Sequence, residues 1–306
     1  MLRKSGMSVK IGKIKLNNPV MVASGTFGYG EEFSEFFSLN KLGAIVSKTV
    51  TINPRQGNPA PRTCETPSGM LNSIGLENPG IEVFIKEKLP VLKKIGIPVI
   101  VSIASEKDLG EFVKLVKRLA KLSVVSAIEL NISCPNMRHT KLISQDATAT
   151  YEVVKSVRRL TSKTLIVKLS PNVTSISEIA LRAEEAGADA VSLINTLNGM
   201  SIDVKTRRPK IAMVTAGLSG PAIRPVAIKM VWEVYNKVKI PVIGMGGIID
   251  TGSALEFLIA GASAISIGTA NFINPKVSIE IIEGITKYMK ENNIRDIRDL
   301  IGSLKK

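Results

Sequence analysis

The sequence is poor in the residue types on which several common kinds of site depend. It has two cysteines and one histidine among 306 residues, and aromatic side chains make up 4%. Two cysteines cannot form a disulfide framework, and the single His139 leaves no basis for a histidine-rich metal site or a conventional Ser-His-Asp triad. So few aromatic rings also disfavour a protein that reads RNA by stacking on its bases.

Long hydrophobic runs are also missing. The longest candidate, residues 95–104, is interrupted by Gly96 and Pro98, and it falls short of the roughly 18 residues that a membrane span needs. The first residues carry charge but lack the apolar core of a signal peptide. We therefore expect a soluble, cytoplasmic protein with no metal and no membrane partner.

Hydrophobic residues and positive charge are both abundant. Hydrophobic residues make up 44%, and the mean hydropathy of +0.19 excludes disorder by composition. The formal net charge is +15. Such an excess indicates either an anionic partner or a lysine-rich solvated surface, and the composition leaves both open.

A helix-like stretch followed directly by an apolar run recurs along the chain. Three such junctions read Gly-Ala and two read Ile-Pro-Val, as expected where a helix ends and a buried strand begins. Repeated units of this kind predict an α/β protein with a parallel sheet. Eight units without a linker fit one (β/α)8 (TIM) barrel domain over residues 1–306, with a doubly wound open sheet as the alternative. The predicted strands are Val20–Val22, Ala44–Val46, Val99–Ser102, Ala127–Leu130, Leu165–Leu169, Ala190–Ile194, Val242–Met245 and Ala264–Ile267.

Two intervals between these strands are too long for plain connections. Residues 49–98 and 195–241 must contain insertions. Because both intervals follow strands, the insertions belong at the C-terminal face of the barrel strands, where such folds carry their active sites.

The residues that follow the strands are polar and suited to binding a ligand. Gly246-Gly247 and Gly268-Thr269 come after the last two strands, where barrels commonly bind a phosphate through backbone N–H groups. No Walker A motif and no G-x-G-x-x-G after a strand is present, so a nucleoside triphosphate or Rossmann dinucleotide site is unsupported.

Three further side chains are candidates for chemistry. Lys48 and Lys168 lie at strand ends, where an unpaired buried ammonium is costly. Each could therefore pair with a ligand anion, form a Schiff base with a substrate, or extend its ammonium to solvent at the barrel mouth. Cys134 lies in a loop between asparagines, which favours a general base or nucleophile over a buried hydrophobe. Cys64 has no predicted role, and His139 is expected at the loop surface.

Several segments, taken together, resemble the class 1 dihydroorotate dehydrogenases, and most closely the class 1B catalytic subunit. The most specific are residues 131–136 (Asn-Ile-Ser-Cys-Pro-Asn) and 218–223 (Leu-Ser-Gly-Pro-Ala-Ile). The others are residues 72–80, 195–203 and 244–248, and the similarity runs from about residue 16 to residue 275.

The resemblance implies an FMN-containing (β/α)8 barrel, with one FMN per chain, that oxidises dihydroorotate to orotate in pyrimidine biosynthesis. It makes Cys134 the catalytic base that takes the C5 proton while the C6 hydride passes to flavin N5. It implies that the substrate is bound by Lys48, Asn72, Ser73, Ile74, Gly75, Leu76, Asn131, Asn136, Asn195 and Thr196. It implies that FMN is bound by Ser24, Lys48, Thr49, Asn131, Lys168, Ile194, Gly220, Gly246, Gly247, Gly268 and Thr269, the last four around its phosphate.

The sequence departs from the family pattern at three places. Residues 137–142 replace the Gly-Gly pair that usually follows Cys-Pro-Asn. Ser102 stands where an asparagine commonly contacts FMN, and Ala216 replaces a glycine. The departures leave the base and the phosphate glycines in place.

The resemblance also implies a partner. Class 1B enzymes pair with a subunit that carries FAD and a 2Fe–2S cluster and passes electrons to NAD, in a heterotetramer built on a homodimer of catalytic chains. A class 1A-like enzyme using fumarate is an alternative, as is a tRNA-dihydrouridine synthase, which the low aromatic content disfavours. Two further alternatives are a basic barrel that binds nucleic acid without catalysis and a phosphosugar enzyme without flavin. Neither function requires the motif at residues 131–136. We therefore expect no nucleic-acid partner.

Overall fold

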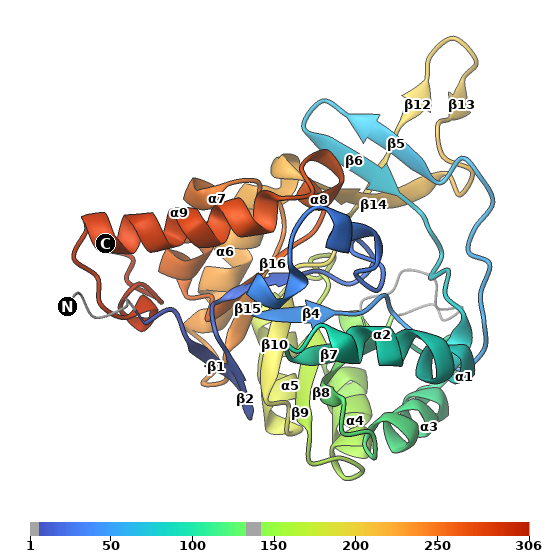
Figure 1. The fold of residues 1–306 in the computed structure, drawn as a ribbon. Helices are drawn as coiled ribbons and strands as arrows, with labels where there is room; N and C mark the ends of the chain where they lie inside the picture. The colour runs from blue at the N-terminus through green and yellow to red at the C-terminus, as the bar shows by residue number, and fades with distance from the viewer. Residues whose placement is uncertain (1–5, 133–141, 306) are drawn as a thin grey trace.

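A computed structural model describes residues 6–132 and 142–305 of the chain. Its eight central strands are parallel and close into a barrel in the order of the chain (Figure 1). This confirms the predicted (β/α)8 barrel, because each strand overlaps an apolar run expected to form one. The barrel strands are β3 (Val20–Val22), β4 (Ala44–Val46), β7 (Val99–Ile103), β8 (Val125–Asn131), β9 (Thr164–Lys168), β10 (Ala190–Leu193), β15 (Val242–Gly244) and β16 (Ala264–Ile267).

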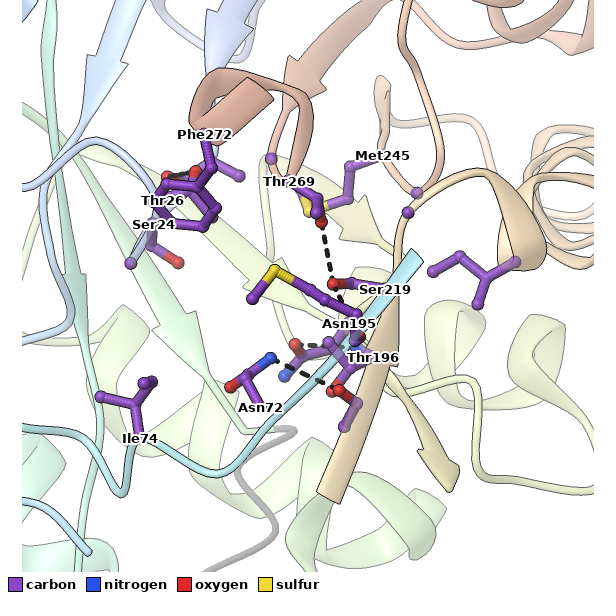
Figure 2. A pocket seen from close by; sticks show the side chains of 18 of the residues that line it. Ser24, Thr26, Asn72, Ile74, Asn195, Thr196, Ser219, Met245, Thr269 and Phe272 are labelled. Carbon is purple, nitrogen blue, oxygen red and sulfur yellow. Dashed lines mark hydrogen bonds between the residues drawn. The ribbon is translucent and has the colours of Figure 1, made fainter. Parts of the chain in front are cut away.

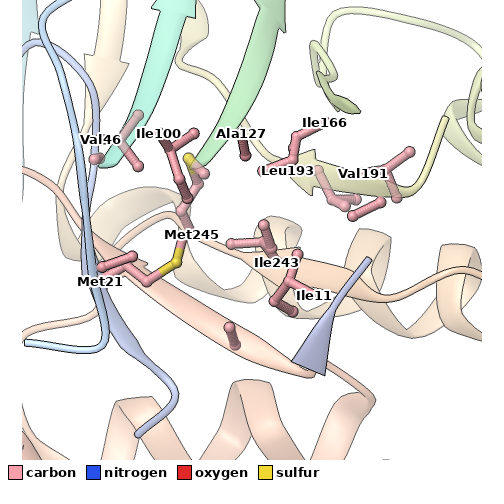
Figure 3. Packing of buried hydrophobic residues seen from close by; sticks show 14 of the residues in the cluster. Ile11, Met21, Val46, Ile100, Ala127, Ile166, Val191, Leu193, Ile243 and Met245 are labelled. Atoms are coloured by element: carbon pink, nitrogen blue, oxygen red, sulfur yellow. The ribbon is translucent and has the colours of Figure 1, made fainter. Parts of the chain in front are cut away.

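Burial explains why these strands read as continuous apolar runs. Every residue of β7 and β9 is buried, because one face of each strand meets the barrel interior and the other meets the surrounding helices. Branched and sulfur-containing side chains pack in the core, among them Met21, Ile100, Ile166 and Met245 (Figure 3). The rigid wall that results holds the strand ends, and therefore the residues that follow them, in fixed positions.

Helices connect the strands and cover the barrel. Several begin at an aspartate or serine whose side chain accepts from a backbone N–H of the first turn, as Asp250 does from Ser253. Hydrogen bonds from Ser253 hold the pKa of the Asp250 carboxyl below its usual value. The helices are α1 (Gly80–Val83), a π-helical turn η3 (Phe84–Lys88), α2 (Leu89–Lys94), α3 (Leu109–Leu119), α4 (Ala147–Arg158), α5 (Ile176–Glu185), α6 (Arg224–Tyr235), α7 (Thr251–Ala260), α8 (Ala270–Ile273) and α9 (Val277–Glu291).

The two predicted insertions pair with each other. The sheet they form has the antiparallel order β11, β14, β6, β5, and Gly217 of β14 pairs with Asn72 of β6. Both insertions follow barrel strands, so the sheet lies at the C-terminal end of the barrel, as predicted (Figure 1). Its strands are β5 (Thr63–Thr66), β6 (Gly69–Asn72), β11 (Leu197–Met200) and β14 (Thr215–Ser219), and β12 (Ile202–Asp203) and β13 (Arg208–Pro209) form a hairpin beyond it.

The remaining elements are short. A hairpin of β1 (Val9–Ile11) and β2 (Ile14–Leu16) contributes buried apolar side chains to the core. None of the helices in the described ranges combines the length and apolar character of a membrane span. The 3-10 turns are η1 (Glu32–Glu35), η2 (Leu39–Lys41), η4 (Ile143–Gln145), η5 (Pro221–Ile223) and η6 (Ile297–Asp299).

Candidate active site

A cavity of about 540 Å³ opens at the C-terminal end of the barrel, between the strand ends and the small sheet. This volume lies within the range typical of sites for cofactors and small substrates. Figure 2 shows Ser24, Thr26 and Phe272 on one side of it and Asn72 and Asn195 on another.

The structure brings the described candidate residues together around this cavity. Cys134 and Asn136 lie outside the described residues. All the others line the cavity: Ser24, Lys48, Thr49, Asn72, Ser73, Ile74, Gly75, Leu76, Asn131, Lys168, Ile194, Asn195, Thr196, Gly220, Gly246, Gly247, Gly268 and Thr269.

Lys168 spans the inside of the barrel. It comes from β9, its side chain is buried, and its Nζ donates to Ser24 Oγ at 3.1 Å. Ser24 follows β3, which lies opposite β9 in the closed barrel. No described carboxylate forms an ion pair with this ammonium, and one hydrogen bond leaves two of its N–H groups for a ligand. A buried cation placed in this way favours an electron-rich ring or an anion directly above it.

A buried carboxyl group lies deeper in the barrel. Glu129 of β8 is 2% exposed and accepts from Ser192 Oγ at 2.9 Å, while its other oxygen has no partner among the described residues. Residues two apart on a strand share a face, so Glu129 lies one layer below Asn131. The interior below the cavity is therefore polar.

Two glycines after β15 form a cradle at one end of the cavity. Gly246 and Gly247 have φ angles of 125° and 80°, which side chains rarely tolerate. A Cβ at Gly247 would lie 2.8 Å from the Gly220 carbonyl oxygen and 2.7 Å from Arg224 Cβ. Only glycine therefore fits between these protein atoms in this conformation, and because both glycines line the cavity, their backbone N–H groups are suited to bind a phosphate.

The ends of β14 and β16 extend this cradle. Thr269 Oγ1 donates to Ser219 Oγ at 2.8 Å (Figure 2). A Cβ at Gly268 would find its nearest neighbours at 3.9 Å, so open space lies above this residue. Hydroxyl groups and exposed backbone around an open pocket are donors of the kind that hold a phosphate.

The loop after β6 forms the wall of the cavity that faces the small sheet. It bends at Gly75 and Leu76, which both have positive φ. Its carbonyl groups are held from outside, because Asn58 Nδ2 donates to Ser73 O at 3.0 Å and Arg55 Nε donates to Gly75 O at 3.1 Å. These contacts fix the residues that line the wall.

Ser102 is used differently from the asparagine it replaces. It is fully buried, does not line the cavity, and its Oγ lies 3.0 Å from Thr49 Oγ1. Asn131 Nδ2 donates to the same Thr49 oxygen at 3.5 Å. Ser102 therefore supports Thr49, which does reach the cavity.

Sequence reasoning missed part of the lining. Ser219 lies in the 218–223 segment that carried the resemblance, Gly217 directly precedes that segment, and Thr26 follows a strand, so the sequence held a signal for them. Thr63, Met70 and Phe272 carry no such signal, because the antiparallel sheet and the short helix α8 bring them to the cavity.

Comparison with known proteins gives consistent matches over nearly the whole chain. The family model for dihydroorotate dehydrogenase matches residues 6–289. The chain is 54% identical over 302 residues to the catalytic subunit of dihydroorotate dehydrogenase B (NAD(+)) of Geotalea uraniireducens, covering 98% of this chain and 99% of the relative. It is also 54% identical over 300 residues to the subunit of that name from Thermoanaerobacter pseudethanolicus, with 98% and 99% coverage. The chain therefore belongs to the dihydroorotate dehydrogenase family.

Proposed function

We propose that this chain oxidises (S)-dihydroorotate to orotate in pyrimidine biosynthesis, with one FMN bound in the cavity. The observation that carries the proposal is the combination of a glycine cradle, a buried lysine and amide side chains around one space. The names of the curated relatives support the same reaction. The reaction removes a proton from C5 and a hydride from C6, and FMN when bound supplies the acceptor for that hydride at its N5.

Amide side chains recognise the substrate. Asn72, Asn131 and Asn195 face the cavity, and an amide both donates and accepts, which matches a ring with alternating N–H and C=O groups. Asn136 joins them by its place in the residue 131–136 motif. Lys48 supplies positive charge to the substrate carboxylate, and Thr196 and the wall of residues 73–76 enclose the ring.

The cofactor is held at its two ends. The phosphate is bound by the backbone of Gly246, Gly247, Gly268 and Thr269, with Gly220 beside them. Ser24, Thr49, Asn131 and Ile194 would border the ring system of bound FMN, and the buried ammonium of Lys168 would stabilise negative charge on that ring.

Cys134 removes the C5 proton. It follows Ile132, the last described residue after β8, by two positions, and β8 also carries Asn131 at the cavity. A thiol with an ordinary pKa of about 8.5 is close enough to neutral pH to act as a base once its surroundings favour the thiolate.

The electrons leave through a partner protein. Two cysteines in the whole chain are too few for the cysteine ligands of an iron–sulfur cluster, and the curated relatives are named catalytic subunits of an NAD(+) enzyme. We assign FAD and the 2Fe–2S cluster to that partner, in a heterotetramer whose core is a homodimer of this chain.

An anaerobic titration tests the substrate and the cofactor together. The purified protein should be yellow, and dihydroorotate should bleach its visible flavin band, whereas succinate as a control dicarboxylate should not. Addition of NAD without the partner should not restore the band. A colourless protein, or a band unchanged by dihydroorotate, would contradict the proposal, and reoxidation by fumarate alone would reassign the acceptor.

Replacing Gly217 by alanine should weaken substrate binding and leave FMN bound. A Cβ at Gly217 would overlap Thr196 Oγ1 and lie 2.6 Å from Thr196 Cβ, so Thr196 must move. Overpacking of this kind costs about 1–3 kcal/mol, and we expect about a 10-fold loss of orotate affinity. The change in the flavin spectrum on orotate addition measures it.

The paired strand offers a matched control for Gly217. A Cβ at Gly199 would first meet the end of the flexible Leu71 side chain at 3.1 Å. Gly199→Ala should therefore keep its orotate affinity, and an equal loss in both variants would remove Thr196 from the explanation.

A further inference from the structure

Asn172 lies just outside the cavity, in the loop between β9 and α5, and its side-chain amide is fully used. Its Oδ1 accepts from the backbone N–H of Asn198 at 2.9 Å. Its Nδ2 donates to the carbonyl of Thr196 at 3.0 Å and to Ser170 Oγ at 3.2 Å. It does not line the cavity, so no direct contact with substrate or cofactor accounts for this arrangement.

The side-chain amide of Asn172 continues the hydrogen-bond ladder between β9 and β10 beyond the point where the backbone can supply it. The pairing of β9 with β10 ends at Lys168 and Ser192, and the Leu169 backbone then donates to the Ser192 carbonyl at 2.8 Å and accepts from the Asn195 N–H at 3.1 Å. Beyond this point the chain after Leu169 turns away through Pro171, which has no N–H to donate. The Asn172 side chain carries the donor and acceptor pair of a peptide group, and it supplies the next rung.

The segment held by this rung carries two residues of the cavity wall. Asn195 and Thr196 line the cavity, and β11 begins at the next residue. Thr196 packs against Gly217 on its other side, as the overlap described above requires. Thr196 is therefore fixed between the amide of Asn172, through its own carbonyl, and the backbone of β14.

Asn172 itself is anchored from the opposite side. Gln145 of η4 donates from Nε2 to the Asn172 carbonyl at 3.1 Å, and the Asn172 N–H bonds Ser170 Oγ at 3.2 Å. Its backbone and side chain are thus both held, and the amide is presented to residues 196–198 in one orientation.

We propose that Asn172 is a positioning residue that sets the orientation of Asn195 and Thr196 toward the pyrimidine substrate. It acts on substrate binding and not on FMN, because its side chain hydrogen-bonds Ser170, Thr196 and Asn198, and no hydrogen bond found among the described residues joins it to the glycine cradle or to Lys168. The inference rests on the proposed function, since it takes orotate as the ligand of this wall.

The variant Asn172→Ala tests it. We expect the Kd for orotate and the KM for dihydroorotate to rise about 10-fold, the effect of losing hydrogen bonds to Thr196 and Asn198. The rate of flavin bleaching at saturating dihydroorotate should change less than about 3-fold on the same scale. The Kd for FMN, measured from quenching of FMN fluorescence by the FMN-free protein, should stay within about 2-fold.

Asn198→Ala is the matched control. The Asn198 side chain is exposed, and its removal keeps the backbone N–H that donates to Asn172, so orotate affinity should not change. Asn172→Asp is a second variant of the same size, which tests the proposal even if the alanine variant fails to fold. It keeps the acceptor for the Asn198 N–H but places a carboxylate oxygen opposite the Thr196 carbonyl, so it should also weaken orotate binding.

The outcomes separate this inference from the proposed function. Unchanged orotate affinity in Asn172→Ala or Asn172→Asp, with a wild-type protein that does bind orotate, overturns the role of Asn172 alone. Equal losses of FMN and orotate affinity also overturn it, because they indicate a general loosening of the barrel end. A wild-type protein that holds FMN but does not bind orotate overturns the proposed function and, with it, this inference.

Discussion

Replacement of Cys134 by alanine is expected to slow bleaching of the bound flavin by dihydroorotate by at least about 100-fold, the usual scale for loss of a positioned base. The C5 proton then has no acceptor of suitable basicity, while the groups that hold FMN are untouched. Stopped-flow absorbance under anaerobic conditions measures the rate, and the absorbance ratio of flavin to protein shows that FMN remains.

The second cysteine gives the control for this experiment. Cys64 lies on β5 and does not line the cavity, so Cys64→Ala should bleach at the wild-type rate. A near-normal rate in Cys134→Ala would remove that residue from catalysis and leave the C5 proton to another group.

The barrel could be predicted from the sequence because its signals are local. The barrel strands are buried on both faces, so a largely apolar run marks each of them, and Gly-Ala or Ile-Pro-Val marks the junction before five of the eight. The parallel arrangement then places the site residues, because the C-terminal ends of the strands meet at one end of the barrel and bring Lys168, Asn131 and Gly246 together.

The small sheet could not be predicted in the same way. Its strands β5 and β11 alternate between exposed and half-buried residues and carry no strong apolar pattern. The pairing of Gly217 with Asn72 joins segments 145 positions apart, and no periodicity encodes a contact of that kind. The cavity residues that depend on this pairing, such as Met70, were missed for that reason.

Two of the three departures from the family pattern have local explanations in the structure. Ala216, which replaces a glycine, is buried in a small cluster with Leu71 and Ile211, so its methyl group adds to packing. Ser102 supports the cavity residue Thr49 through its hydroxyl. The changes at residues 137–142 lie largely outside the described residues.

Substitution of Gly268 by valine is expected to yield a folded protein that has lost its FMN. The space above Gly268 is open, since the nearest atoms would lie 3.9 Å from a Cβ at this position, and its backbone needs no positive φ. A larger side chain therefore fits the empty protein but occupies the volume assigned to the phosphate. Overpacking against a bound group costs about 1–3 kcal/mol, which corresponds at its upper end to about 100-fold weaker FMN binding.

A valine substitution at Gly252 is the control that distinguishes loss of FMN binding from loss of folding. Gly252 of α7 also has open space, with only Asp250 Oδ1 at 3.6 Å from a Cβ, and it does not line the cavity. Gly252→Val should retain FMN, and both variants should melt within a few degrees of the wild type when FMN is removed from all three. If Gly268→Val keeps its yellow colour, the phosphate does not lie against β16, and the cradle of Gly246 and Gly247 must hold it from the other side.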